Sequence, residues 1–404
     1  MTILQKLSTV FFVLIFLLSF VLTITIVKFL LVIYSIFSQK KIKNSVLFLE
    51  NFPKENAGYY YRSKVWADFF KNDGCKAKVL TLFRDKKKWE VATSKGLKKF
   101  IVFSLWIRIY HLFVSLKYER VIVRRELLFY NEYGNLFLEK ILIRIHPNCI
   151  LDFDDDIGAS KKEPRKIDNI IGKILMENGN KFNQSLSTYK RFIVGSEYLK
   201  ELLLSTNKAA DILVVPTCVD FSELSPHRQF SPIVFGWTGI TTNMSLLDAL
   251  IPIFNKYSKD FSFSLNVISG QPYLPPIDPS FVIHSIPWSL ENDQNNLSQI
   301  NIGLMPLENS MMTKGKCGFK LIQYMSLGIP SIGQNITVNA QIIPSNEHGW
   351  LVNDLKDWDK AIFDVLNSTP KTLQEIGTNA FLHIQKEYTF EANYERMKSF
   401  VFRN

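Results

Sequence analysis

The sequence has few cysteines, and none of them forms a closely spaced pair. No CxxC motif occurs along the 404 residues, and the chain has no internal repeat and no low-complexity tract. Structural zinc sites and disulfide frameworks rely on such cysteine pairs, so the sequence indicates neither and suits a reducing compartment. The four separated cysteines are Cys75, Cys149, Cys218 and Cys317.

A nucleic-acid-binding signature is also missing, although the chain carries a net charge of +11. Its lysines and arginines are spread along the sequence, and no RNA-binding or helix-turn-helix pattern occurs. Hydrophobic residues make up 47% of the chain, which is enough for a core and excludes global disorder. The length suits two domains. We therefore expect no nucleic acid as a partner, but an anionic membrane surface and an anionic sugar nucleotide.

The longest apolar run covers residues 7–38 and predicts a hydrophobic membrane anchor. A helix of that length reaches about 45 Å, against roughly 30 Å of hydrocarbon, and Lys28 would snorkel to an interface. The run is too long for a removable signal peptide, and no small-residue cleavage site follows it. Lys40, Lys41 and Lys43 follow directly. By the positive-inside rule they place the domains on the cytoplasmic side of the inner (cytoplasmic) membrane.

Alternating strand and helix patterns over residues 44–220 predict a first doubly wound α/β domain. Within it, the stretch 95–117 is basic and aromatic. It predicts either a second membrane contact lying in the interface or a buried crossover helix, and the second interpretation is favoured. His111 in this stretch is a lone histidine, which favours a packing or surface role over that of a base.

A cluster of carboxylates lies at the end of an apolar strand, in the sequence CILDFDDD over residues 149–156. In an open α/β sheet, the carboxyl ends of the strands face the ligand crevice. Clustered carboxylates raise one another's pKa, which suits acid–base chemistry. Three interpretations stay open. They are a DxD site for Mn²⁺ or Mg²⁺, a catalytic carboxylate (Asp155 or Asp156) that orients or deprotonates an acceptor, and a charged turn capping the next helix.

Residues 232–385 predict a second α/β domain with glycine-containing loops at its sheet edge. Gly236, Thr238 and Gly239 lie at a strand-to-helix turn that suits close backbone approach to a diphosphate. About 80 residues later, a second loop carries Lys316 and Lys320, whose charges suit an anionic phosphate. Two such loops at one sheet edge would flank one ligand.

The stretch 315–354 reads loop, helix, strand, helix, strand. It contains Gly318, Phe319, Lys320, Tyr324, Met325, Gly328, Ile329, Pro330, Asn339, Ile343, Gly349 and Leu351. In these residues it resembles the nucleotide-sugar half of a family 4 (group 1) glycosyltransferase of the GT-B type. The resemblance implies two Rossmann-like domains facing a cleft. It also implies transfer of a sugar from a UDP- or GDP-sugar to a hydroxyl acceptor, with retention and with no obligatory metal or other cofactor. Among the donor-binding residues it implies are Lys316, Lys320, Gln323 and Asn339.

The chain departs from this family at one pair of positions. Most members have two glutamates eight positions apart, where this chain has Gly315 and Gln323. Gln323 retains a group that hydrogen-bonds a ribose hydroxyl, whereas Gly315 has no side chain to replace a carboxylate. The departure favours one alternative to the transferase, a non-catalytic GT-B-like membrane protein with a binding or assembly role.

The resemblance also implies an acceptor side, formed by the first domain. Gly58 and Arg62 in its first loop would meet an acceptor phosphate, and Arg125 and Glu126 end a strand on the same side. A solvated turn with a helix-capping arginine is the alternative for the first pair. Residues 386–404 are expected to form a C-terminal helix that crosses back to the first domain. A tethered enzyme would suit a lipid-linked or surface-glycan acceptor.

Overall fold

The computed structural model describes most of the chain after the first 40 residues. The residues described are 11, 18, 21–22, 25–34, 36, 41–83, 85–94, 97–128, 136–156, 158, 181–220, 229–308 and 310–403. All four cysteines lie within these ranges, and each is free and buried.

The first half of the chain forms a six-stranded parallel sheet with the strand order β2-β1-β3-β4-β5-β6. Its strands are short apolar runs, and Val46, Leu47, Phe48 and Leu49 of β1 are all buried, as expected for a sheet covered on both faces. The strands are β1 (Ile42–Glu50), β2 (Lys76–Thr81), β3 (Tyr118–Arg124), β4 (Ile150–Phe153), β5 (Arg191–Val194) and β6 (Asp211–Val214).

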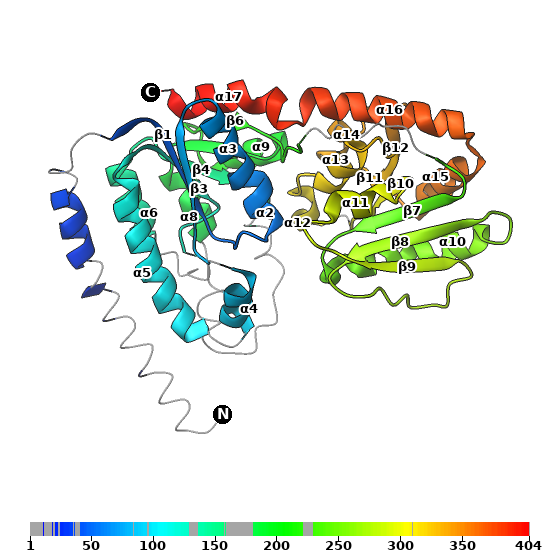
Figure 1. The fold of residues 1–404 in the computed structure, drawn as a ribbon, viewed down its shortest axis with the longest axis horizontal. Helices are drawn as coiled ribbons and strands as arrows, with labels where there is room; N and C mark the ends of the chain where they lie inside the picture. Colours follow the sequence, from blue (N-terminus) through cyan, green and yellow to red (C-terminus); the bar gives the residue numbers. More distant parts are fainter. Residues whose placement is uncertain are drawn as a thin grey trace.

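Helices cover both faces of this sheet (Figure 1). The basic and aromatic stretch forms α5, which is largely a buried crossover helix, since Leu105, Ile109 and Leu112 join the core. His111 is packed against Arg108 at 3.1 Å, and burial lowers its pKa to about 3. The helices are α2 (Ala57–Tyr59), a π-helical turn (Tyr60–Lys64), α3 (Val65–Asn72), α4 (Lys86–Ser94), α5 (Leu97–Ser115), α6 (Phe137–Ile145), α8 (Lys181–Thr188) and α9 (Glu197–Thr206).

The second half forms another six-stranded parallel sheet, with the order β12-β11-β10-β7-β8-β9. The strands are β7 (Ile233–Thr238), β8 (Phe263–Ser269), β9 (Val282–Pro287), β10 (Ile302–Met305), β11 (Ser331–Gln334) and β12 (Gly349–Val352). The helices are a 3₁₀ segment (Thr241–Leu250), α10 (Ile251–Tyr257), α11 (Asp293–Ser298), α12 (Met311–Lys314), α13 (Phe319–Met325), α14 (Asn339–Ile342) and α15 (Leu355–Asn367).

Two C-terminal helices join the halves. Figure 1 shows α16 (Pro370–Glu387) along the second domain and α17 (Phe390–Phe402) along the first, nearly end to end. Phe390 packs its ring against Trp66 of α3 at 4.9 Å, and the Tyr394 hydroxyl donates to Asp73 at 2.7 Å. The C-terminal helix therefore packs on the first domain, although it begins beyond the second sheet. Two α/β domains that face each other and share a crossing helix form a GT-B-like fold.

The predicted membrane anchor falls largely outside the described residues. No helix in the described part of the chain is long and apolar enough to cross a bilayer. Helical residues 25–34 contact the first domain, because Val27 and Leu31 join its core and Tyr34 meets Phe113 edge-on at 6.2 Å. The other apolar side chains of this segment, Ile26, Phe29, Leu30 and Ile33, are exposed.

Candidate functional site between the domains

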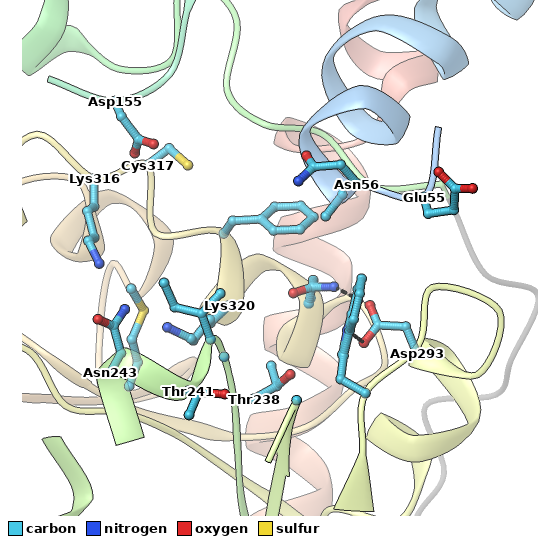
Figure 2. A pocket seen from close by; sticks show the side chains of 18 of the residues that line it. Glu55, Asn56, Asp155, Thr238, Thr241, Asn243, Asp293, Lys316, Cys317 and Lys320 are labelled. Atoms are coloured by element: carbon cyan, nitrogen blue, oxygen red, sulfur yellow. Dashed lines mark hydrogen bonds between the residues drawn. The ribbon is translucent and has the colours of Figure 1, made fainter. Parts of the chain in front are cut away.

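A cavity of about 740 Å³ lies between the two domains, at the carboxyl ends of several strands (Figure 2). In open parallel sheets this edge is where ligands bind. The first domain contributes residues that follow β1 and β4, and the second contributes residues that follow β7, β8, β9 and β10. Its lining includes Asn56, Lys86, Trp89 and Asp155 from the first domain, and Thr238, Gly239, Trp288, Asp293, Lys316, Lys320 and Gln323 from the second.

Two lysines give the cavity its positive charge. Lys316 and Lys320 both line it, and neither forms a salt bridge with a carboxylate in the described ranges. The Lys320 ammonium lies 5.3 Å from the centre of the Trp237 ring. Burial and the neighbouring Lys316 charge lower the pKa of Lys320 to about 8. Two neighbouring cations that form no salt bridge with the described carboxylates make a cavity that favours an anion.

Glycines let the backbone approach the cavity beside these lysines. A Cβ at Gly239 would lie 2.7 Å from the Trp237 ring and 3.0 Å from Lys320 Cε. Gly318 has a positive φ of 66°, and a Cβ there would lie 2.3 Å from Ile342. Both positions therefore require glycine, one for space and the other for space and conformation. The predicted loops of the second domain do meet at one cavity.

Two other predicted donor residues lie behind the cavity lining. Gly236 is inside β7, where a Cβ would lie 2.3 Å from Ile300, so it serves strand packing. Asn339 is buried and donates its amide to the Gln334 carbonyl at 2.8 Å, while its side-chain oxygen faces Gly318. Asn339 thus supports the loop that carries the lysines, and its contact with a ligand would be indirect.

The carboxylate cluster after β4 is divided between different environments. Asp155 lines the cavity, and Figure 2 shows it beside Lys316 and Cys317. Burial and the neighbouring Asp154 charge raise the pKa of the Asp155 carboxyl. Asp156 is buried against the second domain instead, since a Cβ at Gly315 would lie 2.4 Å from Asp156 Cβ. Asp156 therefore occupies the space that a side chain at position 315 would need.

The remaining two carboxylates of the cluster are paired with arginines. Asp152 forms a salt bridge with Arg62, and Asp154 forms one with Arg124 at 2.5 Å. Burial raises the pKa of Asp154, but the charges of Arg124 and Arg62 outweigh burial and hold that pKa well below its usual range. Thr217 connects this network to the second domain, because its hydroxyl contacts Asp154 at 3.3 Å and Cys317 at 3.4 Å. The pairing leaves little unbalanced negative charge for a metal ion at these two positions.

The structure places Arg62 inside the first domain, whereas the sequence analysis expected it at the acceptor side. Arg62 is 3% exposed, and its guanidinium donates to Asp152 and to the carbonyls of Val215 and Pro216. All three of its nitrogens are thereby used in internal contacts. Its place in the fold is that of a buried ion pair beneath the cavity.

Replacing Arg62 with alanine should lower the free energy of unfolding by roughly 3–5 kcal/mol, because it leaves Asp152 buried without its partner. A denaturant titration of the variant and the unaltered chain measures this difference. Arg125→Ala is the matched control, since the Arg125 guanidinium lies over the Phe52 ring at 5.9 Å and forms no salt bridge within the described residues. Wild-type stability combined with a raised KM for an acceptor would instead place Arg62 at the acceptor.

The other predicted acceptor-side residues lie near the cavity without lining it. Gly58 donates its backbone N–H to the side chain of Asn56, which does line the cavity. Glu126 lies 3.7 Å from the Lys181 ammonium in an internal ion pair. Arg125 has a positive φ of 65°, an uncommon conformation for this residue type that turns the chain at the end of β3.

Sequence reasoning missed the residues at one end of the cavity. Trp288 and Asp293 both line it, and so do Lys86 and Trp89 of α4. The signal available for the first pair was the end of β9, where a tryptophan is followed five residues later by an aspartate. For α4 the signal was a run of lysines next to a tryptophan, which charge patterning alone does not assign to a cavity.

Comparison with known proteins gives fold relatives and no sequence relatives. No protein-family model matches the sequence, and no curated protein matches it. A glycosyltransferase from Rickettsia africae ESF-5 superposes with a TM-score of 0.59 at 13% identity, covering 89% of this chain and 100% of that one. Sucrose-phosphate synthase from Thermosynechococcus elongatus gives 0.60 at 11%, covering 88% and 97%. Anabaena HepE in complex with UDP gives 0.56 at 10%, covering 87% and 98%. The chain therefore has the two-domain fold of these proteins.

Proposed function

We propose that this protein transfers a sugar from a nucleotide-sugar donor, a UDP- or GDP-sugar, to a hydroxyl group of a glycan or lipid-linked acceptor. The observation that carries the proposal is the pair of lysines, Lys316 and Lys320, that face the interdomain cavity without a carboxylate partner in the described residues. A diphosphate supplies the negative charge that this pair favours. Positioned cations also stabilise the charge that develops on a departing nucleotide diphosphate.

The shape of the site agrees with this substrate class. A cavity of about 740 Å³ is within the usual range for small-molecule sites and holds a nucleotide with one sugar. The fold relatives include HepE solved with UDP and with UDP-glucose. The family 4 resemblance around the lysines adds the finer assignments of this proposal, which are retention of configuration and no obligatory metal.

Asp155 is the residue assigned to the acceptor hydroxyl. It enters the cavity from the first domain and lies beside Lys316 and Cys317 of the second. A carboxylate with a raised pKa accepts a proton more readily than an ordinary aspartate at neutral pH, which suits orientation or deprotonation of a hydroxyl. Asp156, the second candidate, is in contact with Gly315 and has a supporting role.

The proposal includes attachment to the inner membrane, with the domains on the cytoplasmic side. The apolar run 7–38 supports it, and so do two exposed aromatic side chains on α5 of the first domain, Trp106 and Tyr110, at 55% and 61% exposure. Aromatic residues of this kind favour the membrane–water interface. Flotation of the full chain with anionic vesicles tests attachment, and a chain that stays with the soluble fraction would argue against it.

A non-catalytic role in binding or assembly is the second candidate, and one observation favours it. Neither Gly315 nor Gln323 supplies a carboxylate where most of the resembled family has glutamates. The deciding experiment incubates the protein with labelled UDP- and GDP-sugars and acceptor extract in EDTA, and follows release of nucleoside diphosphate. Release that depends on acceptor supports the transferase. Tight binding without release supports the second candidate.

Donor binding should weaken as the pH rises through about 8, the pKa of Lys320. Below that pKa the side chain is cationic and attracts the diphosphate, and above it the charge is lost. Affinity for a UDP- or GDP-sugar should therefore fall roughly tenfold between about pH 7 and about pH 9.5. Calorimetric titration across this range measures it. Lys320→Met should bind weakly and show a flat profile, and parallel profiles for both proteins would remove Lys320 from the donor site.

A further inference from the structure

A buried carboxylate lines the cavity near Trp288. Asp293, the first residue of α11, is 4% exposed and lies in the lining. The Trp288 indole donates to one of its oxygens at 2.9 Å, and the Gln323 amide donates to the other at 2.8 Å. Figure 2 shows Asp293 on the opposite side of the view from Lys316 and Asp155, with Lys320 between them. These two donors fix the orientation of the carboxylate at the cavity wall.

Within the described residues, this carboxylate forms no salt bridge with a cationic side chain. Burial raises the pKa of Asp293, and the only opposing influences are its hydrogen bonds with Trp288 and Gln323. Two other buried acids are paired with basic groups, since Asp154 faces Arg124 and Glu139 faces Lys181 at 3.1 Å. Holding a carboxylate in the wall of a cavity without a counter-charge costs stability, and a ligand that donates hydrogen bonds would offset that cost.

The chemistry of the group defines the ligand that it recognises. An ionised carboxylate has about four acceptor positions, and Trp288 and Gln323 use two of them. Gln323 donates its amide to Asp293, so its carbonyl oxygen is a further acceptor beside the same cavity. Several acceptors at one place match a group with several donors. A vicinal diol is such a group, and both a ribose and a hexose contain one.

The neighbouring residues indicate which diol it is. The Trp288 ring lines the same cavity and presents an aromatic surface on which a nucleobase can stack. Lys320 is the next charged group toward the middle of the cavity, where a diphosphate would lie. Along the cavity, the groups are therefore arranged as aromatic ring, carboxylate and cation. This is the order of base, ribose and diphosphate in a nucleotide.

We propose that Asp293 binds the ribose diol of the nucleotide donor and that Trp288 and Gln323 hold it in place. The inference rests on the proposed function and assigns its nucleoside end. It places the carboxylate that recognises the ribose on α11, whereas the sequence predicted only the amide of Gln323 on α13. A ribonucleotide is thereby distinguished from a deoxyribonucleotide by a residue outside the lysine-bearing loop.

The test measures affinity of the full chain for UDP and GDP, for their 2′-deoxy and 3′-deoxy forms, and for inorganic pyrophosphate. The unaltered protein should bind the better ribonucleotide roughly tenfold or more tightly than its deoxy forms, because a charge-assisted hydrogen bond is lost. Asp293→Asn should bind ribo and deoxy forms with similar, weakened affinity and leave pyrophosphate binding unchanged. Trp288→Phe keeps the ring and removes the indole donor, so it should reduce the discrimination partly.

The outcomes separate this inference from the proposed function. Tight nucleotide binding by the unaltered chain without ribo–deoxy discrimination overturns the assignment of Asp293 and leaves the transferase proposal in place. If Asp293→Asn weakens binding of a nucleotide sugar but not binding of its nucleoside diphosphate, the diol that Asp293 contacts belongs to the donor sugar. That result would also overturn the assignment. If the chain binds no nucleotide at all, both the assignment of Asp293 and the proposed function are contradicted. Because the analogue series uses the unaltered chain, it can overturn the inference even where a variant fails to fold.

Discussion

Asp155→Asn should lower kcat for sugar transfer by roughly 10²- to 10⁴-fold, the range over which a positioned acid or base contributes. The amide has the shape of the carboxylate but does not take a proton from an acceptor hydroxyl. Donor affinity should change little, because Asp155 enters the cavity from the first domain, away from the proposed nucleoside end. Steady-state kinetics together with calorimetric titration of the donor separate the two effects.

The pH dependence gives this prediction a second readout. Burial and Asp154 raise the pKa of Asp155, so its ionised form is lost as the pH falls through that raised value. The kcat of the unaltered enzyme should therefore fall toward acidic pH, and Asp155→Asn should lose this acidic limb. Asp156→Asn is the matched control, since Asp156 lies against Gly315 and is not itself one of the residues that line the cavity. Equal losses in both variants would contradict the assignment of Asp155 as the reacting carboxylate.

Gly315→Ala should disrupt the contact between the domains and remove most transfer activity. The added Cβ would lie 2.4 Å from Asp156 Cβ and 2.9 Å from the Asp156 backbone nitrogen. A backbone atom is displaced less readily than the end of a side chain, so the two domains must shift relative to each other. We expect the free energy of unfolding to fall by about 1–3 kcal/mol. Gly315→Glu restores the family residue and should likewise lose activity. Thermal unfolding and transfer kinetics measure both variants.

The space at position 315 can be tested by a compensating change. Asp156→Gly removes the nearer of the two contacts and should restore part of the stability that Gly315→Ala loses. Gly270→Ala is the control for the stability measurement alone, because Gly270 lines the cavity and its Cβ would meet nothing closer than Thr241 Oγ1 at 3.5 Å. A gain of transfer activity in Gly315→Glu would show that position 315 holds space for a catalytic carboxylate after all.

The fold was largely predictable from the sequence because its strands are short, buried and bounded by turn residues. The sequence predicted two α/β domains, and the chain forms two six-stranded parallel sheets, β1 to β6 and β7 to β12. Buried parallel strands leave a continuous apolar run, which one sequence reveals without any knowledge of contacts. The membrane anchor differs, since its prediction falls largely on residues outside those described.

The site was predictable only where the backbone imposes a pattern. Gly239 and Lys320 were expected at one cavity because glycine-bearing turns and basic residues end neighbouring strands. Arg62 was misplaced because a sequence does not show that Asp152, 90 residues away, is its partner. Asp293 was missed for the same reason, because its donors Trp288 and Gln323 come from different elements.

At position 315, the contacts in the structure change the interpretation of a departure from the family pattern. In the sequence, Gly315 occupies a position where most members of the resembled family have a glutamate. The missing carboxylate favours a non-catalytic protein. In the structure, Asp156 of the first domain fills that space and Asp155 lies at the cavity beside it. A carboxylate therefore reaches this part of the cleft from the other domain. This arrangement supports the transferase proposal over the non-catalytic one.

The central claim is that the interdomain cavity binds a nucleotide sugar through its lysines, and calorimetric titration tests it most directly. The full chain is titrated with UDP- and GDP-sugars in EDTA, beside a variant carrying Lys316→Met and Lys320→Met. We expect one donor to bind selectively to the unaltered chain and to lose roughly 10²-fold or more of its affinity in the variant. Equal binding by both proteins, or no binding by either, would contradict the claim.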